Sequence, residues 1–176
     1  MPVSKKIIII LVLSTLFIGE LLNSGCGIYK FQDVSIPDSI KTVRVQQITE
    51  NRGGYVNPQL SPQLTDKLRQ KIVNQTRLTQ VNNENAHYDI TGAISQYTVS
   101  TSAISGQQSA TNRLTVGVRI TLRNQLENTS KDFNISRSFE FSATLTLPQA
   151  EAGLKDEMIR TLVDEIFNSI FSNWSE

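Results

Sequence analysis

Alternating apolar and polar side chains predict four β-strands, because successive side chains of a strand point to opposite faces of a sheet. The clearest run is residues 114–122, where apolar residues occupy every second position. Weaker alternation occurs at residues 40–48 and 88–95. A fourth run carries its apolar side chains at Phe133, Ile135, Phe139, Phe141, Ala143 and Leu145. Each run fits a strand with one buried face.

Arg137 interrupts the apolar face of the fourth predicted strand. A β-bulge would explain the interruption, because it resets the alternation of side chains. A bend in the strand would have the same effect. Both interpretations stay open at this point.

Two amphipathic helices are predicted from apolar residues that recur every three or four positions. The first helix has the stripe Leu60, Leu64, Leu68 and Ile72. It begins at Ser61-Pro62 or at Asn57-Pro58, since serine and asparagine are good N-caps and proline suits the first helical position. The second helix opens at Pro148, and its wide apolar face, which Trp174 extends, comprises Leu154, Met158, Ile159, Leu162, Val163, Ile166, Phe167, Ile170 and Phe171.

These elements follow one another in the order βαβββα, which predicts an α+β fold. We expect a two-layer sandwich in which both helices pack on one face of a four-stranded, mostly antiparallel sheet. The opposite face is then polar and uncovered. Residues 100–111 are small and polar, and we expect them to form a long loop.

The amino terminus has the order of a bacterial lipoprotein signal. Lys5 and Lys6 precede an apolar run at residues 7–22, and the only cysteine, Cys26, follows soon after. A basic front, an apolar core and small residues before the cleavage point define a secretory signal. Asn23 stands where a lipobox usually has an aliphatic residue. The pattern predicts a signal peptide at 1–25 and acylation of Cys26; an ordinary signal peptide or a short membrane anchor is the alternative.

Cleavage before Cys26 leaves 151 of the 176 residues, which is enough for one domain with a core. We expect a lipidated tether at residues 26–39 and a single domain at 40–176. The signal contains two of the 17 basic and one of the 16 acidic residues, so the remaining chain has no net charge. Nucleic-acid binding is therefore not supported.

The residues of catalytic and metal sites are sparse. His87 is the only histidine, and zinc needs three or four nitrogen or sulfur ligands. Asp156, Glu157, Asp164 and Glu165 lie opposite the apolar stripe of the last helix, where carboxylates are usually solvated. The sequence predicts neither an enzyme nor a cofactor or metal site.

Basic residues gather in the predicted hairpin of the third and fourth strands. They are Arg113, Arg119, Arg123, Lys131 and Arg137, against two acidic residues in the same segment. We expect the first three, which alternate with apolar residues, to face away from the helices. An anionic partner could bind there; the alternative is that these side chains only solvate the sheet.

Several short segments together resemble the Bacteroidetes branch of the LptE-type lipopolysaccharide-assembly lipoproteins. The similarity extends over the whole chain after the signal and rests on residues 26–29, 56–60, 88–97, 112–116, 166–168 and 173–174. The resemblance implies an outer-membrane lipoprotein that is not an enzyme. It also implies two partners: the LptD β-barrel, whose lumen such proteins plug, and lipopolysaccharide. Arg113, Arg119, Arg123 and Lys131 are the candidate contacts to the barrel or to the lipid phosphates.

A second hypothesis is a periplasm-facing lipoprotein that binds a soluble ligand or scaffolds another envelope complex. A periplasmic hydrolase is a third, and it would depend on the single histidine, His87. Purification of the native protein with or without a large β-barrel distinguishes the first two hypotheses.

Overall fold

The computed structural model describes residues 36–50, 53–105 and 108–172, without the side chains of 103–110. The elements are β1 (Thr42–Val45), β2 (Thr49–Glu50), α2 (Leu60–Gln75), β3 (Thr79–Gln80), β4 (Tyr88–Ser105), β5 (Gln108–Asn124), β6 (Thr129–Ser142) and α3 (Leu147–Phe171). The predicted signal, Cys26 and Trp174 lie outside the described residues. Neither described helix has the length and apolar character needed to cross a membrane.

The sheet has six strands in the order β3-β1-β4-β5-β6, with β2 beside β4. All four predicted strands are present as β1, β4, β5 and β6, but the predicted count was too low by the two-residue strands β2 and β3. Such short strands leave no alternating pattern. The sheet is also mixed, because β1 and β2 run parallel to β4 whereas β5 is antiparallel to both of its neighbours. Helix α2 returns the chain to the end where β1 began, which makes the next strands parallel to β1.

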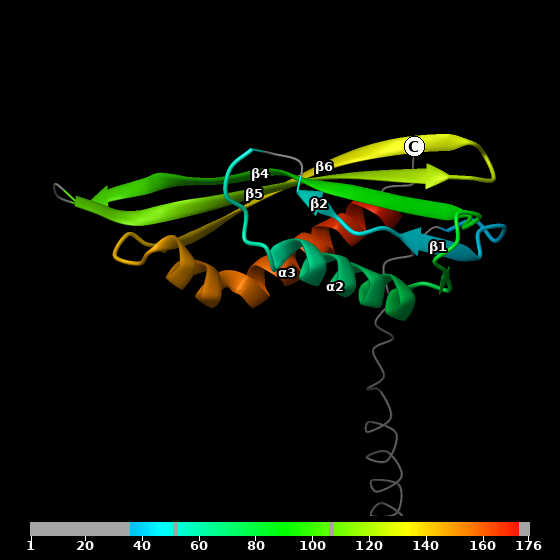
Figure 1. The fold of residues 1–176 in the computed structure, drawn as a ribbon, viewed down its shortest axis with the longest axis horizontal. Coiled ribbons are helices and arrows are strands. Elements are labelled where there is room, and N and C mark those ends of the chain that lie inside the picture. The colour runs from blue at the N-terminus through cyan, green and yellow to red at the C-terminus, as the bar shows by residue number, and fades with distance from the viewer. Residues whose placement is uncertain (1–35, 51–52, 106–107, 173–176) are drawn as a thin grey trace, which may run out of the picture. The chain divides into compact units, whose positions relative to one another are not determined.

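Both helices pack on the same face of the sheet, as predicted (Figure 1). The rows of apolar residues from the two layers form one core. From β5 it takes Leu114, Val116, Val118, Ile120 and Leu122, each at most 2% exposed. The stripe of α2 is equally buried, from Leu60 to Ile72. We call the helix-covered side the inner face and the opposite side the outer face.

Helix α2 begins at Leu60, with Gln59 at the N-cap position between the two predicted caps, Asn57 and Ser61, and no side chain caps it. Ser61 is buried instead, and its hydroxyl donates a hydrogen bond to the Ile48 carbonyl oxygen. The interpretation of Ser61 as an N-cap is therefore wrong. Asn57, from the alternative start, accepts a hydrogen bond from the Gln59 amide at 2.9 Å and forms the turn that leads into the helix.

Helix α3 is the main cover of the inner face. Thr146 and Gln149 form a capping box at its start. Eight of its nine predicted apolar residues are buried, and Leu154 is partly buried. Burial of a large apolar side chain contributes ~1.5–3 kcal/mol, so this helix is a principal source of stability.

The predicted loop at residues 100–111 is wrong. Strand β4 continues to Ser105 and β5 begins at Gln108, so most of this segment is a β-hairpin. The pairing continues beyond the opposed residues Val99 and Leu114. Backbone hydrogen bonds hold such a ladder without an apolar face, and for this reason the hydrophobic pattern did not reveal it.

Arg137 marks no β-bulge, and the alternation of side chains is not reset there. The register between β5 and β6 is unbroken from Thr129 to Ser142, and the register shifts of the sheet lie in the pairing of β4 with β5 instead. Arg137 opposes Val116 and therefore lies on the inner face, where its guanidinium donates to Glu165 of α3 at 2.5 Å. The Arg137 charge can thus lie in the apolar row of β6 because Glu165 of α3 supplies an acidic partner.

The ends of two predicted segments differ from expectation. Leu145 was expected to point inward, but β6 ends at Ser142 and Leu145 is 41% exposed, because the chain turns there into the cap of α3. At the other end, Ile36 of the expected tether is buried in the core. Arg77 donates a hydrogen bond to its carbonyl at 2.5 Å. Packing therefore begins before Ile40.

A buried carboxylate joins α3 to the segment before α2. Glu151 is 3% exposed and accepts hydrogen bonds from the hydroxyls of Tyr97 (2.5 Å) and Tyr55 (2.9 Å) and from the amide of Asn57 (3.0 Å). Burial and the bond to Glu151 raise the pKa of Tyr97. Glu151 lies in the helical phase of Met158 and Leu162, so periodicity alone could have placed it on the buried side.

Replacement of Ile166 tests whether α3 is structural. Ile166 is fully buried, so Ile166→Ala is expected to lower the free energy of unfolding by ~2–5 kcal/mol through lost burial and a cavity. Urea denaturation measures this change. The control Asn168→Ala, at an exposed position of the same helix, should stay within ~0.5 kcal/mol of the parent. Equal stability of the two variants contradicts the role assigned to α3.

Candidate functional site

The outer face of the sheet is the candidate site because it is polar and no described helix covers it (Figure 1). Residues that pair directly across neighbouring strands share a face, so the register defines its members. They include Arg44, Gln46, Asp89, Thr91, Thr98, Arg113, Thr115, Arg119, Thr121, Arg123, Asp132, Asn134, Ser136, Ser138 and Glu140. Hydroxyl, amide and charged groups therefore line one whole side of the domain.

The three candidate arginines of β5 lie on this face. Arg113, Arg119 and Arg123 are all exposed and alternate with the buried row of the same strand. The prediction that they point away from the helices is confirmed. Lys131 is not with them, because it pairs with Leu122 and therefore lies on the inner face, where it is exposed. The four candidate residues consequently do not form one cluster.

Arg113 is neutralised by its neighbours. Its guanidinium donates to Glu140 of β6 at 2.9 Å and to the Ser102 hydroxyl at 2.9 Å, and Ser102 in turn donates to Glu140 at 2.8 Å. These bonds, with that from Arg113 the stronger influence, hold the pKa of the Glu140 carboxyl below its usual value. This end of the hairpin is less basic than its sequence indicates.

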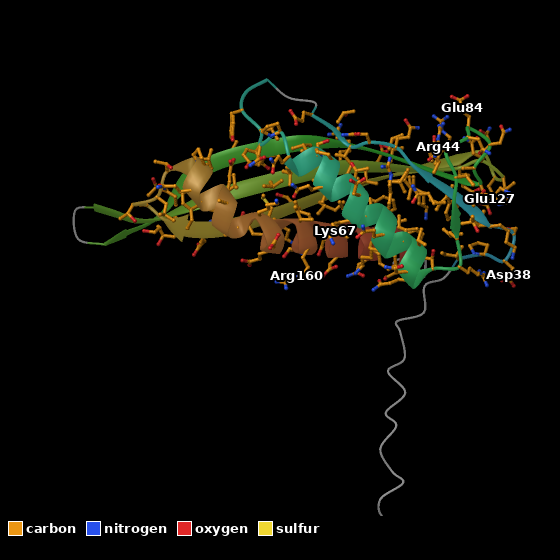
Figure 2. The ribbon with its side chains drawn as sticks, turned by 60° about the horizontal axis from the view of Figure 1, so that its bottom comes forward. Asp38, Arg44, Lys67, Glu84, Glu127 and Arg160 are labelled. Carbon is orange, nitrogen blue, oxygen red and sulfur yellow. The ribbon has the colours of Figure 1, made fainter. Side chains whose placement is uncertain are left out.

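A second network, which sequence reasoning missed, lies where β1 meets β4. Asp89 is 5% exposed and accepts two hydrogen bonds from Arg44 at 2.8 and 2.9 Å and two from Gln46 at 3.1 Å. The bonds from Arg44 lower the pKa of Asp89, although burial opposes them. Arg44 also lies 3.9 Å from Glu84, and the two are labelled together in Figure 2. The alternation of β4 placed Asp89 on the outer face, but nothing in the sequence indicated its partner.

Arg119 and Arg123 are the outer-face cations without a salt bridge among the described residues. Arg119 donates through Nε to Asn134 at 3.2 Å, which leaves its terminal nitrogens available. It borders a shallow hollow of about 270 Å³, whose lining also includes Gln46, Gln47, Thr49, Thr91, Gly92, Ala93 and Thr121. The hollow offers one guanidinium, hydroxyls and amides. Such a set can bind a phosphate or a sugar hydroxyl through hydrogen bonds.

His87 has a structural role. Its Nδ1 accepts a hydrogen bond from the Lys41 amide at 3.0 Å, and its own amide donates to Thr42. These bonds join β4 to the start of β1. In the described part of the chain no three or more His, Cys, Asp or Glu side chains are grouped as metal ligands would be.

A second concave surface lies between the helices. The groove has a volume of about 790 Å³, and charges of both signs line it, among them Asp66, Lys67, Lys155, Asp156 and Arg160. Lys67 and Arg160 lie on the exposed side of the two helices in Figure 2. Lys71 also lines the groove. Its Nζ atom pairs with the Asp164 carboxylate at 2.8 Å and lies 5.1 Å from the centre of the Phe167 ring.

Removal of the Asp89 charge tests the second network. Asp89→Asn is expected to lower the free energy of unfolding by ~1.5–3 kcal/mol at neutral pH, because charge-assisted bonds to Arg44 are lost. The lowered pKa of Asp89 stabilises the parent fold above the unfolded value of about 3.9, and this stabilisation disappears as the pH falls through the folded pKa. Urea denaturation from pH 7 to pH 3 measures both effects.

Two results check the interpretation. Glu140→Gln, which removes an exposed carboxylate from its pair with Arg113, is expected to cost much less stability than Asp89→Asn. If Asp89→Asn and the parent lose stability in parallel below pH 4, Asp89 does not supply the acid-sensitive interaction.

Comparison with protein-family models places residues 40–170 in the LptE family, described as "Lipopolysaccharide-assembly". A search of curated proteins found no significant match. Among solved structures, a neuraminyllactose-binding hemagglutinin homologue from Helicobacter pylori is 12% identical, with 79% of this chain and 87% of that chain covered and a TM-score of 0.50. At this identity the likeness concerns the fold alone.

Two lipoproteins are similar at lower scores. Rare lipoprotein B from Shewanella oneidensis is 14% identical with a TM-score of 0.49, covering 72% of this chain and 92% of that one. A minor lipoprotein from Acinetobacter baumannii is 12% identical with a TM-score of 0.46, covering 75% and 93%. The family match spans most of the chain, including both helices and every described strand. The chain belongs to the LptE family of lipopolysaccharide-assembly proteins.

Proposed function

We propose that this protein is an outer-membrane lipoprotein, anchored through Cys26, that plugs an LptD-type β-barrel during lipopolysaccharide assembly. The observation that carries the proposal is the outer face, a continuous polar surface on one side of a sheet whose other side holds the whole core. The lumen of an outer-membrane barrel is polar and water-filled. A plug therefore needs hydrogen-bonding groups on a rigid support, and β4, β5 and β6 provide them.

Most outer-face side chains are already hydrogen-bonded to one another within the domain, in the absence of a partner. Thr115 bonds to Ser138 at 2.9 Å, Thr121 donates to Asp132 at 2.6 Å, and Arg113 binds Glu140. Such pairs fix side-chain rotamers, so binding to a lumen wall costs less conformational entropy. Hydroxyls keep further acceptor capacity after donating one bond. The face is thus ordered and still able to bind.

Lipopolysaccharide carries phosphates, and Arg119 and Arg123 are the guanidiniums best placed to contact them. Neither forms a salt bridge with a described residue, and both lie on the outer face of β5. Arg123 lies opposite Asp89 in the sheet, and its charge helps to lower the pKa of that carboxyl. Arg119 borders the hollow beside Thr91 and Thr121. Charge-assisted bonds from arginine to phosphate are strong when partly desolvated.

A ligand-binding module in another envelope complex is the second candidate. The groove between α2 and α3 favours it, because a volume of about 790 Å³ falls within the range of small-molecule sites. Its mixture of Asp66, Asp156, Lys67 and Arg160 offers no single charge for a ligand to match. The outer face is therefore the better supported of the two candidate functional surfaces.

Purification of the native protein in mild detergent tests the plug directly. The protein is expected to elute with a large β-barrel protein in equal molar amount, because a plug and its barrel form a permanent complex. Quantitative mass spectrometry of the peak measures the ratio. Elution of the protein alone, or with another envelope complex, would refute the barrel partner.

Anchoring is tested separately. Cys26→Ala is expected to move the protein from the membrane to the soluble fraction or to leave it unprocessed, because each buried methylene of an acyl chain contributes ~0.8 kcal/mol and two or three chains hold a domain firmly. Fractionation and the mass of the mature amino-terminal peptide measure the effect. Mature parent protein without added mass on Cys26 contradicts acylation.

The arginine contacts are tested by serine variants. Arg119→Ser/Arg123→Ser is expected to weaken binding to purified lipopolysaccharide at least several-fold and to leave the melting temperature nearly unchanged, because exposed side chains contribute little to stability. Arg113→Ser is the matched control, since that guanidinium is bound to Glu140, and the triple variant gives the full effect. Binding is measured for the protein alone and in complex with its barrel. Unchanged binding in the triple variant means that the arginines only solvate the sheet.

A further inference from the structure

Strand β6 forms one edge of the sheet over its whole length. The order β3-β1-β4-β5-β6 leaves it with β5 as its single neighbour among the described strands. Its 14 residues, Thr129–Ser142, extend over roughly 48 Å at about 3.4 Å per residue. An edge strand presents a row of backbone N–H and C=O groups that another strand can bind.

Two backbone hydrogen bonds show which way the peptide groups of β5 point. The Gln125 amide donates to the His87 carbonyl oxygen at 2.8 Å, so this end of β5 bonds to β4 through its odd-numbered residues. The Gln46 amide donates to the Ile90 carbonyl oxygen at 2.9 Å, so Ile90 points away from β5. Leu122 opposes Ile90. The even-numbered residues of β5 therefore direct their backbone groups to β6.

In β6 the odd-numbered residues are consequently the ones bonded to β5. Leu122 opposes Lys131 and Val118 opposes Ile135, and the register is unbroken. Opposed residues of an antiparallel pair either bond to each other or both point away. The backbone groups on the open side belong to Ser130, Asp132, Asn134, Ser136, Ser138 and Glu140. The side chains of these residues lie on the outer face, so the polar surface continues around the edge of the sheet.

This edge lacks the usual protection against strand addition. Edge strands are commonly short, bulged, broken by proline or defended by free charges. β6 is long, contains no proline and has an unbroken register. Its outer-face carboxylates, Asp132 and Glu140, already bind Thr121 and Arg113 within the domain. Such an edge can accept an added strand.

The wall of a barrel cannot supply that strand. Every strand of a closed barrel is bonded on both sides, so the wall has no open edge. A second copy of the domain has no place in a lumen that holds one. The remaining donor is a segment of the barrel protein that enters the lumen, as loops do in plugged barrels. Such a segment needs partners for its own backbone groups, and β6 offers them.

The side chains of β6 indicate the chemistry of the segment that fits. On the inner side, Lys131 is exposed, Phe133 is only partly buried and the Arg137 side chain is 45% exposed. Helix α3 thus leaves this row accessible, and acidic or aromatic side chains of a neighbouring strand would be attracted to it. On the outer side, the central residues Asn134 and Ser136 are uncharged. They suit a strand with polar, uncharged residues on that face.

We propose that an extended luminal segment of the barrel partner adds to β6 as a further strand of the sheet. The segment carries acidic or aromatic side chains on the inner side and uncharged polar ones on the outer side. This inference rests on the proposed plug function and specifies how the plug is held. Main-chain hydrogen bonds along the edge supply the contact, in addition to the side chains of the outer face.

Hydrogen exchange of the native complex tests the added strand, because it separates alternate residues. The full-length protein is purified with its barrel in mild detergent, and exchange is measured for single amides by mass spectrometry with fragmentation. The amides of Asn134, Ser136 and Ser138 are expected to exchange as slowly as those of Ile135 and Phe139, which bond to β5. In the full-length protein without its barrel, the three even-numbered amides are expected to exchange at least about tenfold faster, and the odd-numbered ones to stay protected.

The possible failures are distinguishable. Fast exchange of the even-numbered amides within an intact complex overturns strand addition and leaves the plug function standing. Equal protection with and without the barrel also overturns it, because the chain itself then covers the edge. A preparation that contains no barrel overturns both proposals.

Two variants at one residue separate the main chain from the side chain. Ser136→Ala and Ser136→Pro both remove the hydroxyl, but only proline removes the amide hydrogen, and on the open side of an edge strand it breaks no bond to β5. Ser136→Pro is expected to retain several-fold less barrel than Ser136→Ala after a urea wash of the complex. Melting curves check that each variant folds, and Ser138→Pro with Ser138→Ala replaces the pair if Ser136→Pro does not. Equal retention by a folded proline variant contradicts the proposal.

Discussion

The fold depends on burial of a single apolar face of the sheet beneath two helices. The row from Leu114 to Leu122 is excluded from solvent, and so is the facing row of α3 from Met158 to Phe171. Because both helices occupy this side, the other side has no apolar surface to cover. Residues of the outer face can therefore be polar or charged without any loss of apolar burial in the core. The separation of core and outer face is what allows one small domain to combine stability with a large polar surface.

Charged side chains at the boundary of the core each have partners within the domain. Arg137 enters the inner face only where Glu165 meets it, and Glu151 is buried only where two tyrosines and Asn57 donate to it. A buried charge without such partners would be costly. On the outer face Asp89 is satisfied by Arg44 and Gln46. Arg119 and Arg123 are exposed and keep their charge toward solvent.

The sequence predicted the parts of the fold that depend on regular burial. The four longer strands, both helices and the outward direction of Arg113, Arg119 and Arg123 follow from periods of two and of three to four residues. It failed where backbone pairing acts without an apolar face. The two-residue strands β2 and β3 and the hairpin beyond Val99 leave no such pattern.

The candidate site was only partly predictable for a related reason. A sequence shows which residues alternate, but the cross-strand partner of each residue depends on register. The register separates Lys131 from the arginines and brings Glu140 to Arg113. It also joins Arg44 to Asp89, which are 45 positions apart. The apparent basic patch of the hairpin is therefore reduced to Arg119 and Arg123, the two of its arginines that form no salt bridge with a described residue.

The central claim is that the outer face lies against a β-barrel partner. Site-specific photo-crosslinking in living cells tests it most directly, with the crosslinking side chain placed at Thr115 in the centre of the outer face or at Gln70 on the exposed side of α2. The account predicts a strong adduct with a large outer-membrane barrel protein from position 115 and a much weaker one from position 70. Adducts of equal strength at both positions, or an adduct from position 70 alone, would contradict it.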